Sequence, residues 1–193
     1  LCPALCTAAE AIGTATLRNR ATLVGNLCNA SPAADTAPVL LVLDATVCST
    51  DREGFRRTPM ANFFQGVRRT TLGREEIVTS VTLSPPEGLR TVFHKQQRIR
   101  GHDLAVVNLA GSYSPQSRQI RVAIGSCAPI PVLLPPVEVH GADRAKVVGK
   151  VLELARRALS PISDVRATSS YRWAVLEALL HRAIEELLGG GRR

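Results

Sequence analysis

Residues 17–38 read LRNRATLVGNLCNASPAADTAP, a short stretch that gathers small and polar residues of the kind that surround bound phosphates: Gly25, Asn26, Ser31 and Asp35. Small residues let main-chain N–H groups come within hydrogen-bond distance of phosphate oxygens, and a carboxylate accepts hydrogen bonds from sugar hydroxyls. The stretch therefore predicts a loop that binds a phosphorylated cofactor. A polar surface turn is the alternative, because Gly25 stands alone and Val24 occupies the place of a second glycine.

Four stretches of the sequence resemble one known family, in the same order. Residues 17–38 resemble the second flavin-contacting loop of the FAD-binding medium subunits of molybdenum hydroxylases, the family of carbon monoxide dehydrogenase and xanthine dehydrogenase. The family pattern at that place is R-N-x-x-T-I-G-G-N-I-x-x-x-S-P-x-x-D. The other three stretches are PMANFFQGVRRT at 59–70, FHKQQRIRGHDLA at 93–105 and PISDVRATSSYR at 161–172.

The N-terminal part of the family has no counterpart in this sequence. Members open with a subdomain that carries a first Gly-rich loop of the A-G-G-T type, whereas this sequence resembles them only from the helix ahead of the second loop. Three explanations are open. The chain is a truncated product, another polypeptide supplies the missing half, or the protein has lost flavin binding.

The resemblance implies that seven residues contact FAD: Thr22, Gly25, Asn26, Ser31, Asp35, Ile77 and Lys95. The first three would donate hydrogen bonds to the phosphates, and Ser31 would lie in the same turn. Asp35 would bind ribityl or ribose hydroxyls, and Ile77 would pack against the adenine or the flavin ring. The ammonium of Lys95 would lie near the isoalloxazine, where a cation stabilises the anionic reduced flavin. No catalytic nucleophile and no metal ligand is predicted.

Ordinary structural roles compete with these assignments. Thr22 could cap or fill a turn, and Asp35 could be the N-cap of a helix that begins at Thr36. A lysine on a strand, such as Lys95, is usually a solvated edge residue. The pattern around Arg98, Arg100 and Asp103 favours a structural ion pair over a catalytic dyad.

Composition narrows the class of protein. The net charge is +8, yet no helix-turn-helix, zinc finger or aromatic-bearing sheet motif accompanies the basic clusters. A solvated basic face, or a face that meets acidic partner subunits, is therefore favoured over nucleic-acid binding. Five cysteines without a C-x-x-C pair argue against a disulfide framework and against zinc or iron–sulfur sites. They indicate reduced thiols in a cytoplasmic protein. No run reaches the roughly 18 apolar residues of a membrane span.

The Pro/Gly-rich segment 84–88 (SPPEG) predicts a domain boundary, because its prolines remove ladder donors and its glycine frees the backbone. It divides a partial FAD-binding domain, residues 1–84, from a C-terminal α+β domain, residues 88–190. Before the boundary, the patterns predict a helix, a hairpin, two buried phenylalanines and a half-buried strand: 4–12, 45–49 with 55–58, Phe63 and Phe64, and 77–83.

After the boundary, the patterns predict three strands and two amphipathic helices: 90–96, 104–113, 119–126, 145–159 and 169–188. The expected fold class is α+β. It is the C-terminal part of a two-subdomain FAD-binding (PCMH-type) domain, followed by a three-stranded antiparallel sheet packed on two or more helices.

The resemblance implies an FAD-binding electron-transfer subunit of a molybdenum-containing oxidoreductase. Electrons would come from molybdopterin and [2Fe–2S] centres held by a large and a small partner subunit, and would leave to NAD⁺, a quinone or oxygen. The competing hypothesis is a flavin-free homologue that acts as an interaction or assembly module.

Overall fold

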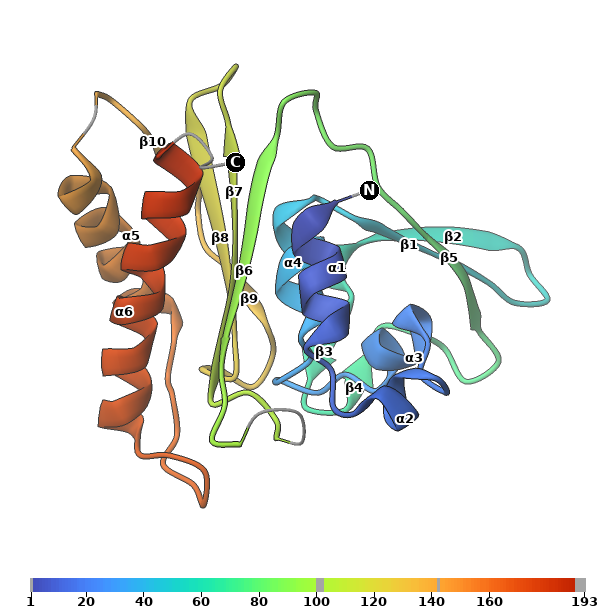
Figure 1. Ribbon diagram of the computed structural model, residues 1–193. Coiled ribbons are helices and arrows are strands. Elements are labelled where there is room, and N and C mark those ends of the chain that lie inside the picture. The colour runs from blue at the N-terminus through green and yellow to red at the C-terminus, as the bar shows by residue number, and fades with distance from the viewer. Residues whose placement is uncertain (1, 100–102, 142, 190–193) are drawn as a thin grey trace.

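An antiparallel sheet forms the centre of the molecule (Figure 1). The structure is a computed structural model that describes residues 2–99, 103–141 and 143–189. The sheet has the order β10-β8-β7-β6, with β9 paired to β8: β6 (Arg90–Gln96), β7 (Val107–Ser114), β8 (Gln119–Gly125), β9 (Val132–Leu133) and β10 (Val137–Glu138). The three long strands confirm the predicted meander. The two short strands were not predicted, because two residues next to prolines carry almost no strand pattern.

One face of the sheet is covered by two helices, α5 (Arg144–Ala158) and α6 (Ser169–Leu188), which confirms both predicted helices. Each begins after a side chain that accepts a hydrogen bond from the first turn, Asp143 for α5 and Thr168 for α6. Their apolar stripes pack on the sheet. None of the helices in the described ranges is both long and apolar enough to cross a bilayer.

The other face of the sheet is covered from the N-terminal half of the chain. Helices α1 (Pro3–Glu10) and α4 (Thr36–Val42) lie there, and every residue of α4 is buried. Phe93, Ala110 and Ala123 point from the sheet into this second layer, and the two alanines leave room for α4 to approach. The sequence predicted helices on one face only. The second covering layer comes from the segment that was assigned to a separate domain. It was not predicted, because these helices lie far from the strands of the sheet in the sequence.

A smaller three-stranded sheet with the order β2-β1-β5 lies beyond α4, made of β1 (Thr46–Thr50), β2 (Phe55–Pro59) and β5 (Ile77–Thr82). Its hairpin confirms the predicted pairing, with Cys48 opposite Arg57. The 3₁₀ helix η1 (Met60–Asn62) follows, and then the short pair β3 (Phe64–Gly66) and β4 (Arg69–Thr70). Phe63 and Phe64 are buried, as predicted. The domain boundary at 84–88 stays a prediction.

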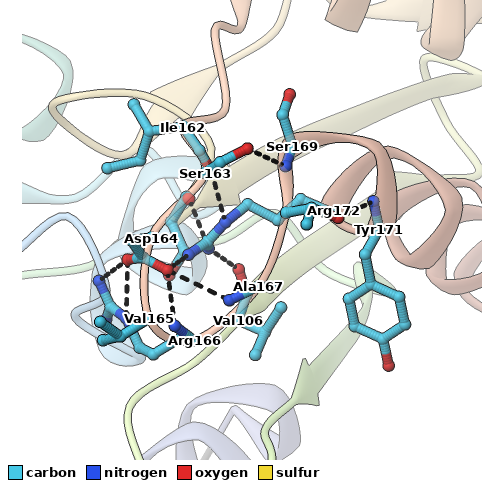
Figure 2. A network of polar contacts seen from close by, with 12 residues as sticks. Val106, Ile162, Ser163, Asp164, Val165, Arg166, Ala167, Ser169, Tyr171 and Arg172 are labelled. Atoms are coloured by element: carbon cyan, nitrogen blue, oxygen red, sulfur yellow. Dashed lines mark hydrogen bonds and ion pairs between the residues drawn. The ribbon is translucent and has the colours of Figure 1, made fainter.

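A buried arginine joins the last helix to the central sheet (Figure 2). Arg172 on α6 is 1% exposed, and its guanidinium donates to the carbonyls of Val106, Ser126 and Ile162 and to the carboxylate of Asp164. Burial disfavours the charged form of Asp164. Hydrogen bonds from the side chain and backbone of Arg166, from the Ala167 backbone and from Arg172 outweigh burial, and they hold the pKa of Asp164 well below its ordinary value. The polar residues of the stretch 161–172 thus hold the start of α6 against the central sheet.

Candidate functional site

The segment predicted as a phosphate-binding loop is built from short helical turns. Helix α2 (Ala15–Arg18) begins after Thr14, and α3 (Leu23–Cys28) begins after Thr22. The Thr22 hydroxyl accepts a hydrogen bond of 2.9 Å from the backbone N–H of Gly25, so Thr22 is an N-cap. A Cβ atom on Gly25 would lie 2.9 Å from that hydroxyl oxygen, so a larger residue there would displace the capping side chain.

Three of the predicted side chains have hydrogen-bond donors that no contact among the described residues uses. Thr22 accepts from Gly25, Asn26 Oδ1 accepts from the hydroxyl of Thr36 at 2.7 Å, and Ser31 Oγ accepts from the N–H of Ala33 at 3.2 Å. Among the contacts within the described part of the chain, none uses the hydroxyl hydrogens of Thr22 and Ser31 or the amide hydrogens of Asn26. Thr22 is exposed, and Asn26 and Ser31 are half-buried. This segment can therefore donate to an anionic group.

Asp35 and Lys95, which the resemblance assigned to different parts of FAD, form an ion pair with each other inside the molecule. The Lys95 ammonium on β6 lies 2.7 Å from Asp35 Oδ2 and also donates to the carbonyl of Ala11 at 2.8 Å. Asn108 on β7 donates to Asp35 Oδ1 at 2.9 Å. The side chains of Lys95 and Asp35 are 6% and 7% exposed. Lys95 is thus not a solvated edge residue, and Asp35 stands at the N-cap position of α4 without capping it.

The carboxyl group of Asp35 feels two opposing effects. Burial raises its pKa above the ordinary value, because the charged form loses its hydration. The Lys95 ammonium and the hydrogen bonds from Lys95 and Asn108 act in the other direction by stabilising the carboxylate. Because both oxygens of the Asp35 carboxylate accept hydrogen bonds from the central sheet, Asp35 holds the start of α4 against that sheet.

Two open cavities lie beside this segment. The smaller, about 220 Å³, is lined by residues that include Ile12, Thr22 and Thr36. The larger, about 650 Å³, is lined by residues that include Lys95 and Gln97. Glu10 and Arg18 line both cavities. The cavities therefore adjoin at these two side chains.

Arg18 was not among the residues predicted to contact a ligand. One of its terminal nitrogens donates to the carbonyls of Ile12 and Gly13 at 3.0 and 2.9 Å, which holds the guanidinium at the junction of the cavities. A guanidinium has five N–H donors, so further donors are left for an anion. The R-N-x-x-T pattern, which begins at Arg18, was the feature of the sequence that could have indicated this residue.

The remaining predictions fall outside this cluster. Ile77 is 68% exposed at the start of β5, opposite Thr50, and it is not among the described residues that line either cavity. Arg98 and Asp103 form the predicted ion pair at 2.7 Å, with Arg100 outside the described residues. All five cysteines are free thiols. The described residues contain no group of three or more His, Cys, Asp or Glu side chains placed to hold a metal ion.

Known proteins resemble this chain along almost its whole length. Residues 1–86 match the family described as the FAD binding domain in molybdopterin dehydrogenase, and residues 92–187 match the CO dehydrogenase flavoprotein C-terminal domain. The glyceraldehyde dehydrogenase medium chain of Sulfolobus acidocaldarius is 29% identical over 186 residues, which are 93% of this chain and 66% of that protein. The xanthine dehydrogenase FAD-binding subunit of Escherichia coli O157:H7 is 27% identical over 205 residues, with 98% and 68% covered.

A solved structure has the same fold. The carbon monoxide dehydrogenase from Hydrogenophaga pseudoflava that lacks the Mo-pyranopterin moiety superposes with a TM-score of 0.86 at 22% identity, over 95% of this chain and 66% of that one. The chain spans about two thirds of the length of these relatives. With its two matched domains in the same order, the chain belongs to the family of FAD-binding medium subunits of molybdenum hydroxylases of the xanthine and carbon monoxide dehydrogenase type.

Proposed function

We propose that this chain is the FAD-holding, electron-transferring component of a molybdenum hydroxylase. The proposal rests on the side-chain hydrogen-bond donors of Thr22, Asn26 and Ser31. In each of these side chains the oxygen accepts a hydrogen bond from within the chain, and no contact among the described residues uses the donor. A pyrophosphate presents acceptor oxygens and negative charge, so it needs such donors around it. The residues present fit that part of FAD.

Charge and space support the same cofactor. Arg18 lines both cavities, and Thr22 lines the smaller one with it, whereas Asn26 and Ser31 are not among the described residues that line either cavity. The larger cavity, at about 650 Å³, lies within the range of roughly 300–1,000 Å³ that is usual for small-molecule sites. Lys95 is one of the residues that line it, and the charge of Lys95 is balanced by Asp35.

The residues of this chain would bind and orient the cofactor without covalent chemistry. Bound FAD would supply reversible two-electron redox chemistry. Thr22, Asn26 and Ser31 would donate hydrogen bonds to the phosphates, and Arg18 would neutralise part of their charge. Direct contacts of Gly25, Asp35, Ile77 and Lys95 with FAD stay predictions. The charged groups of Asp35 and Lys95 are already paired with each other.

We also propose the partners that family membership implies. Relatives are described as a medium chain and as an FAD-binding subunit, so this chain would work beside other subunits. Those partners would be a molybdopterin-binding large subunit and an iron–sulfur small subunit, with electrons passing to an acceptor from the flavin side. The cytoplasmic location predicted from the sequence stays a prediction.

FAD binding by the full natural polypeptide tests the proposal. We expect the purified protein to retain flavin absorbance after gel filtration. Arg18→Ala should raise the dissociation constant for FAD by about tenfold or more, the value of a hydrogen bond between charged groups. The dissociation constant is measured by titrating the apoprotein with FAD and following flavin fluorescence.

Arg52→Ala is the matched control, because Arg52 is on the β1–β2 hairpin with a side chain that is 90% exposed. It should bind FAD as the wild type does. Thermal melts establish that both variants are folded. A wild-type protein that binds no FAD, or equal affinities for the two arginine variants, would contradict this placement of the site.

A further inference from the structure

Thr36, at the start of α4, faces the proposed FAD site from the inside. It is 1% exposed, and its hydroxyl donates to Asn26 Oδ1 at 2.7 Å. Asn26 lies on α3, ten residues earlier, so this bond joins the two helices on either side of the turn that contains Ser31. Thr36 also lines the smaller cavity together with Thr22.

The position of Thr36 is fixed by the central sheet. The preceding residue, Asp35, is held by Lys95 on β6 at 2.7 Å and by Asn108 on β7 at 2.9 Å. The N–H of Ser126, just after β8, donates to the carbonyl of Pro32 at 2.8 Å. Two strand residues and the residue just after β8 therefore hold Pro32 and Asp35. Thr36 is the first residue of α4 and directly follows this held segment.

The hydroxyl of Thr36 lies against the oxygen end of the Asn26 amide. An asparagine amide has one carbonyl oxygen, which accepts, and one NH₂ group, which donates twice. Because the hydroxyl of Thr36 occupies the oxygen, the NH₂ group lies on the opposite edge of the amide, away from the buried threonine. A rotated amide would present its oxygen to a phosphate, and two acceptors repel.

We propose that Thr36 is a positioning residue of the FAD site, which orients the amide of Asn26 so that its NH₂ group donates to the cofactor phosphate. The inference rests on the proposed function, and it names a residue whose role is indirect. Thr36 need not touch FAD at all.

Two variants of the full natural polypeptide test this role. Thr36→Val has nearly the same shape but lacks the hydroxyl, and we expect it to raise the dissociation constant for FAD about tenfold, the value of one hydrogen bond to a charged group. Thr36→Ser keeps the hydroxyl and should bind FAD within about twofold of the wild type. Loss of this one hydrogen bond should lower the melting temperature of the apoprotein by only about 2–4 °C, so that the variant stays folded at the temperature of the titration. A purely structural role would lower the melting temperature and leave the affinity for FAD unchanged.

A double-mutant cycle with Asn26→Ala shows whether Thr36 acts through Asn26. Asn26→Ala should weaken FAD binding about tenfold, and adding Thr36→Val should weaken it no further. Additive losses, equal affinities of Thr36→Val and Thr36→Ser, or unchanged FAD binding by Thr36→Val would each overturn the inference while the proposed function stands. A wild-type protein without FAD affinity would instead overturn the proposed function, and the inference with it.

Discussion

At the scale of single residues, Gly125 makes room for the side chain that anchors the site. Asn108 on β7 is fully buried and stands directly opposite Gly125 on β8. A Cβ atom at position 125 would lie 2.1 Å from Asn108 Oδ1 and 3.0 Å from the carbonyl oxygen of Pro32. The Pro32 carbonyl accepts a hydrogen bond from the N–H of Ser126, and the amide of Asn108 donates through its nitrogen to Asp35, so both neighbours of the added Cβ help to fix residues 32–35 to the sheet. The glycine is thus required by space, and its backbone angle plays no part.

Gly125→Ala should therefore destabilise the protein. Overpacking of a filled interior typically costs about 1–3 kcal/mol, and here it would also push Asn108 off Asp35. Gly149→Ala is the matched control, because nothing lies within 4 Å of its added Cβ on the exposed side of α5. Alanine there should stabilise the helix by about 0.5–1 kcal/mol. Urea unfolding followed by circular dichroism measures both changes, and equal signs for the two would contradict the argument.

At the scale of elements, one carboxylate ties together the three strands of the smaller sheet. Glu76, just before β5, accepts hydrogen bonds from Arg56 on β2, whose Nε lies at 2.8 Å, from the hydroxyl of Ser49 on β1, and from the N–H of Gly73. The hydrogen bonds from Arg56 and then from Ser49 lower the pKa of Glu76 from 4.5 to about 2. This sheet is therefore held partly by charge.

The stability that Glu76 contributes should depend on pH. Since its pKa is lower in the folded protein than in the unfolded chain, the contribution is complete above pH 4.5 and is lost as the pH falls toward about 2. Glu76→Gln should lower the urea midpoint at neutral pH, and its difference from the wild type should shrink over that acid range. Glu75→Gln, whose side chain is 71% exposed, should show no such trend. A constant difference between Glu76→Gln and the wild type would contradict this account.

At the scale of the whole molecule, the central sheet is shared by two hydrophobic cores. Leu109 and Val122 point toward α5 and α6, whereas Ala110 and Ala123, next to them along the strands, point toward α1 and α4. Alternation along a strand sends neighbouring side chains to opposite faces. Loss of the sheet would therefore expose both cores at once.

The chain should for that reason unfold in a single cooperative transition. Trp173 on α6 is the one tryptophan of the sequence, and it reports on the core between the sheet and helices α5 and α6. The buried thiol of Cys48 on β1 reports on the N-terminal half. Trp173 fluorescence and alkylation of Cys48, located by peptide mass spectrometry, should give the same urea midpoint. Clearly separate midpoints would mean that the segments before and after 84–88 unfold as independent units.

The sequence by itself determined the elements whose signal is local. The hairpin around Gly54, the strand at 90–96 and the helix at 169–188 were predicted within a few residues, because turn residues and apolar periodicity act over short distances. The tertiary structure alone decided where the predicted site residues go. Lys95 meets Asp35 across 60 residues of sequence, and Asn108 meets it across 73, so neither contact has a local pattern.

For residues 17–38, too, the sequence and the tertiary structure determined different properties. Their composition predicted a compact, polar stretch that binds phosphate, which stays a prediction. Which atoms remain free to bind was decided by the fold, because Thr36 and the strands behind it occupy the acceptor atom of Asn26 and both oxygens of Asp35. A sequence shows which residues can donate or accept, whereas only the packed structure shows which of those groups are already taken.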